Sequence, residues 1–242
     1  MTNQIITILD VPFVNQRKSE VVHDLYHQYI KEEKKALVVT ANPEIVMQAR
    51  EDREYHTILK TADIIVPDGI GVIIASKMKK TPLVERVPGF ELMEDLLALG
   101  NENPISFYIV GAKPEILEEA VQNLHTTYPN LHLAGHHHGY FQDDDETIME
   151  DIQRTKPDVI LVALGFPRQE KWIAANLPKV EKGVFMGVGG SIDVLAGHVK
   201  RAPVFFQKIH LEWFYRLLKQ PSRWRRMLVL PQFIITVMKS KH

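Results

Sequence analysis

The stretch Ala36-Leu37-Val38-Val39-Thr40-Ala41-Asn42-Pro43 (residues 36–43) decides the fold of this chain. Its first five residues are mostly apolar and β-branched, which is typical of a short buried strand. Asn42 and Pro43 end that strand, and the residues from Glu44 to Arg50 then follow a helical period. A buried strand that leads directly into a helix is the repeating unit of a parallel sheet with helices on its faces.

The same unit recurs along the whole chain. The pattern predicts strands at Ile5–Leu9, Ala36–Thr40, Asp63–Val66, Ser106–Val110, His132–Ala134, Val159–Ala163 and Gly183–Met186. It predicts helices at Ser19–Glu32, Glu44–Arg50, Tyr55–Thr61, Gly71–Lys77, Gly89–Leu99, Pro114–Thr127, Asp144–Arg154, Gln169–Asn176 and Ser191–Leu195. We therefore expect an α/β fold, with a Rossmann-like, mostly parallel sheet sandwiched by helices.

The composition limits the cellular setting. The chain has 242 residues, of which 45% are hydrophobic, and it has no cysteine. Disulfides, thiol nucleophiles and Cys-ligated metals are thereby excluded, and a reducing cytosol is the expected compartment. The N-terminus has no secretory signal pattern. The longest apolar stretch, Met227–Met238, is 12 residues long, well short of the ~20 residues that span a bilayer, so we expect a chain that lies on a membrane at most.

Charge is distributed very unevenly. Residues 200–242 contain ten Lys or Arg and one acid, Glu212, whereas the preceding 199 residues contain 19 basic and 29 acidic side chains. Seven aromatic residues are interspersed among the cations of this tail. We therefore predict two parts, an α/β catalytic domain at 1–200 and a basic, aromatic, helical appendage at 201–242 that meets anionic phosphate on a membrane or on nucleic acid.

Polar, glycine-rich segments follow the predicted strands. They begin near Asn42, Asp68, Gly111, Gly165 and Gly189. In an open α/β sheet, ligands bind at the carboxyl ends of the strands, and glycines let backbone N–H groups approach a phosphate closely. The segments together favour a nucleotide or nucleotide-sugar site, although any one of them alone is also consistent with a simple turn. Neither a G-x-G-x-x-G after the first strand nor a P-loop is present, which disfavours dinucleotide dehydrogenases and P-loop NTPases.

Two charged side chains stand out as candidate catalytic groups. Asp68, between Pro67 and Gly69, is placed either to act as a general base or to cap the following helix. Arg86 precedes a helix and suits the binding of a diphosphate, and the alternative is a surface ion pair with Glu85 or Glu91.

Two other clusters resemble metal sites only superficially. His136, His137 and His138 are consecutive, so on an extended segment their rings point to opposite faces, and we expect a partly exposed strand end there. The acids at 143–145 are interpreted as a solvated helix start. No metal and no cofactor is therefore expected.

These segments together resemble one family, the WecG/TagA/CpsF glycosyltransferases (glycosyltransferase family 26), over nearly the whole chain. Within that family the sequence is most similar to the TagA/TarA branch of wall teichoic acid synthesis. The matching segments are Thr40–Glu44, Pro67–Val72, Glu85–Gly89, Gly165–Trp172, Gly187–Asp193 through Gly197, Arg201–Pro203, and Leu211–Leu217 with Pro221, Arg223 and Arg226.

The resemblance implies a reaction and a set of site residues. The reaction is transfer of N-acetylmannosamine from its UDP donor to the 4-hydroxyl of undecaprenyl-diphosphate-linked N-acetylglucosamine, with inversion to a β1,4 linkage, at the cytoplasmic face of the bacterial cell membrane. Asp68 corresponds to the proposed base, and the appendage supplies arginines over the pocket. Residues that the resemblance places in the site are Thr40, Asn42, Arg86, Gln169, Arg216, Arg223 and Arg226; Gly111, Gly165 and Gly189 are added as backbone contacts to the substrate.

The tail and the activity each leave alternatives open. Residues 204–219 have helical spacing of aromatic and basic positions, which fits an amphipathic helix on an anionic membrane or, alternatively, a contact within a homo-oligomer. A nucleic-acid-binding protein is disfavoured by the acidic body and the lack of a known motif. A non-catalytic UDP-sugar sensor and a transferase of another sugar (N-acetylmannosaminuronic acid, glucose or galactose) remain as alternatives.

Overall fold

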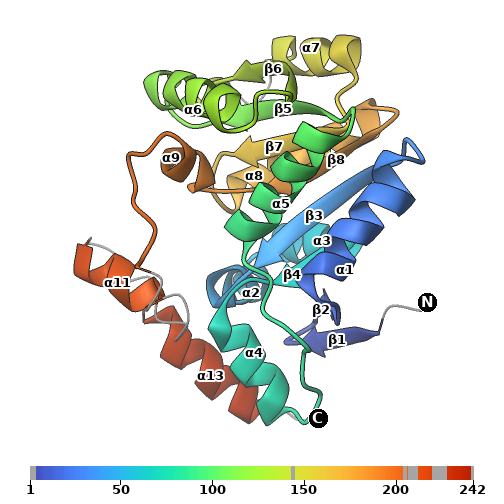
Figure 1. Cartoon of the computed structure of the whole chain (residues 1–242). Coiled ribbons are helices and arrows are strands. Elements are labelled where there is room, and N and C mark those ends of the chain that lie inside the picture. Colours follow the sequence, from blue (N-terminus) through green and yellow to red (C-terminus); the bar gives the residue numbers. More distant parts are fainter. Residues whose placement is uncertain (1–3, 143–144, 204–205, 207–211, 220–227, 241–242) are drawn as a thin grey trace.

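The computed structural model describes residues 4–142, 145–203, 206, 212–219 and 228–240. Its centre is a six-stranded sheet in the order β4-β3-β8-β7-β5-β6, in which every neighbouring pair is parallel (Figure 1). The strands are β3 (Lys35–Ala41), β4 (Ile64–Pro67), β5 (Ser106–Gly111), β6 (His132–His137), β7 (Val159–Ala163) and β8 (Gly183–Gly187). The predicted parallel α/β fold is therefore confirmed.

Helices cover both faces of this sheet. Strand side chains alternate between the two faces: Leu37 and Val39 of β3 belong to one apolar cluster, and Ala36 and Val38 belong to the other. The first cluster is covered by α2 (Pro43–Glu51), α3 (Arg53–Thr61), α4 (Ile70–Met78), α7 (Thr147–Thr155) and α8 (Arg168–Asn176). The second is covered by α1 (Lys18–Asp24), the π-helix η1 (Leu25–Ile30), α5 (Gly89–Glu102), α6 (Pro114–Thr127) and α9 (Ser191–Leu195). A short 3₁₀ turn, η2 (Leu177–Lys179), follows α8.

The first predicted strand is not part of the parallel sheet. β1 (Ile5–Ile8) pairs antiparallel with β2 (Val11–Val14), which the sequence pattern did not predict, and together they form a separate hairpin. Leu9 and Asp10 make the connection, and both have positive φ, as a two-residue hairpin turn of this kind requires. The prediction of a parallel strand there was therefore wrong, because a short apolar run does not reveal its pairing partner.

The remaining differences concern element ends. The helix predicted at Ser19–Glu32 is an α-helix that becomes the π-helix η1. The strand predicted at His132–Ala134 continues to His137 as β6. The helix predicted at Asp144–Arg154 begins at Thr147.

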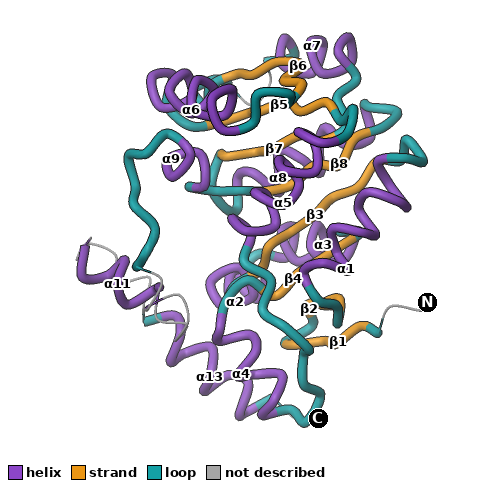
Figure 2. The backbone as a smooth tube through the Cα atoms, in the orientation of Figure 1, coloured by secondary structure: helices purple, strands orange, loops and turns teal. Residues whose placement is uncertain are grey.

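The tail contributes two described helices, α11 (Glu212–Lys219) and α13 (Val229–Lys239). Figures 1 and 2 show α13 lying alongside α4 at the end of the molecule that carries β1 and β2. Phe233 and Val237 of α13 are buried and belong to the same apolar cluster as α2 and α4. No helix in the described part of the chain is both long and apolar enough to cross a bilayer. Of the helix predicted at 204–219, the structure describes Phe206 and α11, which is helical, whereas residues 204–205 and 207–211 lie outside the described residues.

Candidate functional site

The carboxyl ends of all six parallel strands meet at one edge of the sheet. Because β3 and β4 are neighbours, the segments that carry Asn42 and Asp68 lie side by side there, and the backbone N–H of Asp68 donates a hydrogen bond to the carbonyl of Ala41 over 3.1 Å. The segment after β8 comes next along the edge, followed by those after β7 and β5. The segments chosen from the sequence are thus brought together by the fold.

The turn around Asp68 is closely packed. A side chain at Gly69 would place its Cβ 2.6 Å from Pro43 Cδ and 3.1 Å from Asn42 Cβ, closer than nonbonded atoms approach. α4 begins at Ile70 with Gly69 as its N-cap residue, so Asp68 lies one residue before the N-cap position. Asn42 is itself an N-cap, because its Oδ1 accepts a hydrogen bond from the backbone N–H of Ile45 over 3.1 Å. Both side chains are half-buried at this corner of the sheet edge.

The start of α5 closes the same corner from the other side. The backbone N–H of Val87 donates to the carbonyl of Pro67 over 2.9 Å. A Cβ on Gly89 would lie only 2.7 Å from Thr40 Oγ1, so glycine is needed for α5 to approach Thr40 this closely. Thr40, Asn42 and Asp68 therefore form one compact group that is bordered by the segment carrying Arg86.

Arg86 is held by the single acid of the tail. Its Nη2 donates to Glu212 Oε2 over 2.6 Å, and only 12% of the Arg86 side chain is exposed. Glu212 Oε1 lies 3.7 Å from Arg201 Nη2, so the carboxylate of Glu212 lies between two guanidinium groups. The predicted ion pair with Glu85 or Glu91 was wrong in its partner, since Glu91 pairs instead with Lys18 and Arg201. Arg86 thus joins the strand-end corner to α11.

Gln169 is clamped between two parts of the chain. Its Oε1 accepts from the backbone N–H of Gly189 over 3.0 Å, and its Nε2 donates to Glu170 Oε1 over 2.7 Å. Both side chains are buried, and burial raises the pKa of the Glu170 carboxyl above its usual range. The amide of Gln169 therefore fixes the position of the segment that follows β8.

All three predicted glycine contacts have a positive φ that favours glycine, and that of Gly165 is +74°. Gly111 has a φ of +130°, and a Cβ there would lie 2.4 Å from the carbonyl oxygen of Ala163. Gly189 has a φ of +51° and open space where a Cβ would be. Gly111 thus lets β5 and β7 end close together, whereas Gly189 leaves its backbone accessible at the edge.

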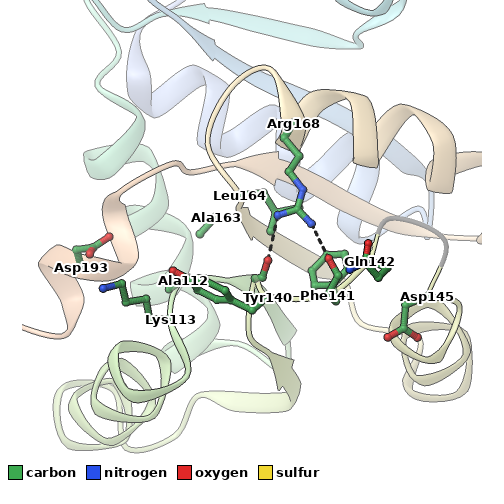
Figure 3. A pocket seen from close by; sticks show the side chains of 11 residues that line it. Ala112, Lys113, Tyr140, Phe141, Gln142, Asp145, Ala163, Leu164, Arg168 and Asp193 are labelled. Atoms are coloured by element: carbon green, nitrogen blue, oxygen red, sulfur yellow. Dashed lines mark hydrogen bonds between the residues drawn. The ribbon is translucent and has the colours of Figure 1, made fainter.

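An open cleft of about 1260 Å³ lies at the ends of β5, β6 and β7. Figure 3 shows its side chains, with Lys113 and Asp193 together on one side and Phe141, Gln142 and Asp145 on the other. Its lining combines two cations, two carboxylates, two aromatic rings and apolar groups: Ala112, Lys113, Gly139, Tyr140, Phe141, Gln142, Asp145, Ala163, Leu164, Arg168 and Asp193. A cleft that mixes apolar walls with a few charged groups is suited to a nucleotide-sized polar ligand.

Arg168 builds one wall of this cleft. It donates from Nη1 to the carbonyl of Gly139 and from Nη2 to the carbonyl of Phe141, each over 3.0 Å (Figure 3). The guanidinium carbon also lies 4.9 Å from the centre of the Phe141 ring, within range of a cation–π contact. Arg168 therefore ties the segment after β6 to the start of α8.

The sequence analysis considered two clusters as metal sites, at 136–138 and 143–145, and expected no metal at either. Among them, no group of three or more His, Cys, Asp or Glu side chains is placed to hold a metal ion. His136 is half-buried near the end of edge strand β6, and its Nε2 lies 3.1 Å from Glu118 Oε1. Asp145 accepts hydrogen bonds from the hydroxyl and backbone N–H of Thr147, which lower the pKa of its carboxyl. Residues 143 and 144 lie outside the described residues.

The predicted site residues that the structure describes on the α/β domain fall into three groups along the edge. One is the corner around Asp68, and a second borders the cleft, where Gly111 and Gly165 adjoin lining residues. Gln169 and Gly189 form the third, at the end of β8, between β3 and β7. The structure describes the backbone of Arg216 in α11 but not its side chain, and Arg223 and Arg226 lie outside the described residues.

Sequence reasoning named none of the eleven lining residues as a site residue, and the polar ones it missed include Lys113, Tyr140, Arg168 and Asp193. Lys113 directly follows the Gly111-Ala112 strand end, so the rule that selected Gly111 also pointed to Lys113. Tyr140 was missed because the strand before it was predicted to end at Ala134 rather than His137. The partners of Arg168 are backbone carbonyls, which a sequence pattern does not reveal.

Comparison with known proteins identifies the family of this chain. Residues 6–242 match the model of the glycosyl transferase WecG/TagA/CpsF family. A protein of Bacillus subtilis (strain 168) is 38% identical over 235 residues, covering 97% of this chain and 91% of the relative. A protein of Staphylococcus aureus (strain MW2) is 40% identical over 237 residues, covering 98% and 93%. Both are named N-acetylglucosaminyldiphosphoundecaprenol N-acetyl-beta-D-mannosaminyltransferase. The chain therefore belongs to the WecG/TagA/CpsF family of glycosyl transferases.

Proposed function

We propose that this chain transfers N-acetylmannosamine from a UDP donor to the 4-hydroxyl of N-acetylglucosamine on undecaprenyl diphosphate, with inversion to a β1,4 linkage. The observation that carries this proposal is the name shared by relatives that match 97% and 98% of the chain. The product is the lipid-linked disaccharide that begins the linkage unit of wall teichoic acid. The open cleft at the strand ends is the proposed place for the donor nucleotide.

Asp68 is the proposed general base. A direct displacement at the anomeric carbon requires removal of the proton from the acceptor hydroxyl as the new bond forms. Asp68 is held on a turn that is fixed by the hydrogen bond to Ala41 and by the tight packing of Gly69 against Pro43. A base on such a rigid turn stays aligned with the acceptor. Thr40 and Asn42, in the same group, are proposed to position the substrates.

Arginine side chains are proposed to stabilise the leaving group. Negative charge builds on the diphosphate of UDP as the glycosidic bond breaks, and fixed cations at that position lower the barrier. Arg86 is the candidate on the α/β domain, and Arg216, Arg223 and Arg226 are candidates on the tail. Cations supplied by the protein do the work that a divalent ion does in other transferases, so we expect activity without added metal.

The lipid-linked acceptor places the reaction at a membrane surface. We propose that the chain associates peripherally with the cytoplasmic face of the bacterial cell membrane, where anionic lipids attract its basic tail. We propose that docking brings the site to the lipid-linked acceptor and holds the tail over it, so that turnover is faster at the membrane than in solution. A homo-oligomer is a further proposal, and we propose no nucleic-acid partner.

The test is a turnover assay with UDP-N-acetylmannosamine and a short-chain, water-soluble lipid-diphosphate N-acetylglucosamine acceptor. We expect the intact chain to form disaccharide, to retain its rate in EDTA, and to lose at least ~100-fold of kcat when Asp68 is changed to Ala. Asp68→Asn is the matched variant, because it keeps the shape of the side chain and removes only its basicity. Product formed from another UDP-sugar but not from this donor would contradict the proposed substrate, and UDP-sugar binding without any turnover would contradict the proposed reaction.

A further inference from the structure

Helices α4 and α13 lie side by side and run in the same direction. At their first turns, a Cβ built on Gly71 would lie 2.6 Å from Leu230 Cδ1. At their last turns, Lys79 Nζ donates to Ser240 Oγ over 3.1 Å. The pair therefore forms a two-helix layer, with one helix from the α/β body and one from the tail (Figure 1).

Both helices of this layer expose large apolar side chains. Ile74 is 43% and Met78 39% exposed on α4, and Ile235 is 50% and Met238 69% exposed on α13. These four side chains, here called the α4–α13 face, repeat at spacings of four and three residues, so each pair forms a stripe on its own helix. They make up nearly half of the exposed large hydrophobic residues among the described part of the chain. Exposed apolar side chains that gather on adjacent helices mark an interaction surface.

The charges around the α4–α13 face have one sign. Residues 69–84 and 228–240 include four lysines, at 77, 79, 80 and 239, and no acid. Lys77, Lys80 and Lys239 are exposed. Protein–protein interfaces are depleted in lysine, and two copies of a uniformly basic face would repel each other. An anionic lipid surface complements both the apolar stripes and the lysines.

The α4–α13 face is directly connected to the candidate site. Gly71, which contacts Leu230 of α13, is three residues after Asp68. Pro43 packs against both Gly69 and Gly71, so the start of this layer and the corner that holds Asp68 are one packed unit. A bilayer under the α4–α13 face would therefore lie next to the group proposed to activate the acceptor.

We propose that the α4–α13 face docks on an anionic bilayer, with Ile74 and Met78 of the α/β body entering the lipid interface together with Ile235 and Met238. Membrane contact is then not confined to the tail, and α4 contributes to it from within the α/β body. This inference deepens the proposed function, because it places the acceptor's diphosphate at the level of the strand-end corner.

The test is co-sedimentation with vesicles, carried out without any substrate. Vesicles of phosphatidylcholine with and without phosphatidylglycerol are mixed with the intact chain and with two double variants, Lys77→Glu with Lys80→Glu, and Ile74→Gln with Met78→Gln. Because each lysine near an anionic surface contributes about fivefold, we expect binding to phosphatidylglycerol vesicles to weaken about thirtyfold in the lysine variant. We expect at least a fivefold loss in the apolar variant, whose charge is unchanged.

A matched control removes the effect of net charge. Lys34 and Lys60 are exposed, and each precedes a strand of the sheet, so they lie at the edge opposite the site. The variant Lys34→Glu with Lys60→Glu changes the net charge equally, and we expect it to bind vesicles within about threefold of the intact chain. Equal losses in the two lysine variants would overturn the proposal, and so would full vesicle binding by the Ile74→Gln, Met78→Gln variant. Thermal unfolding checks that each variant is folded.

Two further readouts separate this proposal from its rivals. If sedimentation velocity shows a dimer that the apolar variant breaks, while vesicle binding is unchanged, the face binds a second copy and the proposal is wrong. On a short-chain, water-soluble acceptor we expect all variants to turn over at the rate of the intact chain, whereas on a long-chain acceptor in vesicles the face variants should slow. If the intact chain turned over neither acceptor, the proposed function would be contradicted. The vesicle-binding result would still decide the docking proposal, because it is measured without substrate.

Discussion

Glu170 is a carboxyl group in the protein interior, next to a residue proposed to shape the site. It is 1% exposed, and its Oε1 accepts the hydrogen bond from Gln169 that fixes the amide toward Gly189. Its Oε2 and the hydroxyl oxygen of Tyr55 are both buried and make no hydrogen bond of good geometry, although the two groups are near enough for each to influence the pKa of the other. Because burial disfavours the charged form, the pKa of Glu170 is raised. A neutral side chain of the same shape should therefore suit this position.

We predict that Glu170→Gln folds and turns over close to the intact chain, whereas Glu170→Ala is less stable by ~2 kcal/mol. The glutamine keeps an oxygen for Gln169 and adds an N–H for the Tyr55 hydroxyl, while alanine leaves the Gln169 donor buried and unpaired. Urea denaturation at a fixed pH measures the difference. Equal free energies of unfolding for the two variants would contradict this account.

The same carboxyl predicts a pH dependence. A carboxyl whose pKa is raised in the folded state binds more protons when folded, so its favourable contribution is complete below the unfolded pKa and is lost as pH rises through the folded pKa. The free energy of unfolding of the intact chain should therefore fall relative to that of Glu170→Gln from pH ~4.5 upward, and the difference should level off above the folded pKa. Urea titrations of both proteins across that pH range measure this difference directly, since other groups cancel. A difference that does not change with pH would contradict it.

At the scale of elements, the strand–helix units of the parallel sheet could be predicted from the sequence. The strand and the turn that were missed each have a local cause. The stretch from Ala36 to Pro43 predicted the strand, its end and the helix start to within one residue, because its apolar run and its Asn-Pro boundary agree. β2 was missed because Pro12 interrupts a short apolar run, a residue that normally argues against a strand. Leu9 is not a typical residue at positive φ, and the turn lacks the Asn-Gly or Asp-Gly pair that usually marks a two-residue hairpin, so the sequence signal was weak.

The sequence contained an indication of the contact between α11 and the α/β domain, but the prediction did not use it. Glu212 is the only acid in residues 200–242, and an isolated acid among ten cations suggests a specific basic partner. The structure supplies that partner as Arg86, with Arg201 nearby. The sequence could not predict that Arg86 is the partner of Glu212, because 126 residues separate the two and only the tertiary fold brings them together.

We predict that Glu212→Gln loosens α11 without unfolding the sheet. A half-buried, charge-assisted hydrogen bond contributes ~1.5–3 kcal/mol, so amide hydrogen exchange in α11 should speed up by at least tenfold while β3 and β8 stay protected. Glu181→Gln is the matched control, because its pair with Lys156 is largely exposed and contributes little. Unchanged exchange in α11 would show that the pair does not hold this helix in place.

At the scale of the whole molecule, the tail is tied to the acidic body in two different ways. Polar contacts through Glu212 and Arg201 join it near the site. Apolar contacts of Phe233 and Val237 join it to the cluster shared by α2 and α4. The sequence predicted the boundary near residue 201 from charge alone, but charge gives no information about the apolar contact. Removing the tail therefore affects both the site and the core.

We predict that a chain ending at residue 200 loses both stability and turnover, and that the two losses can be separated in the full chain. Phe233→Ala should lower the free energy of unfolding by ~3–4 kcal/mol, the usual cost of emptying a buried phenylalanine site. It keeps every tail cation, so turnover on a water-soluble acceptor, measured well below its melting temperature, should stay within about threefold. Changing Arg216, Arg223 and Arg226 together to Gln should instead leave the melting temperature nearly unchanged and reduce kcat by at least ~100-fold. If the arginine variant keeps full turnover, the tail acts only by packing and docking, and the leaving-group role falls to the α/β domain.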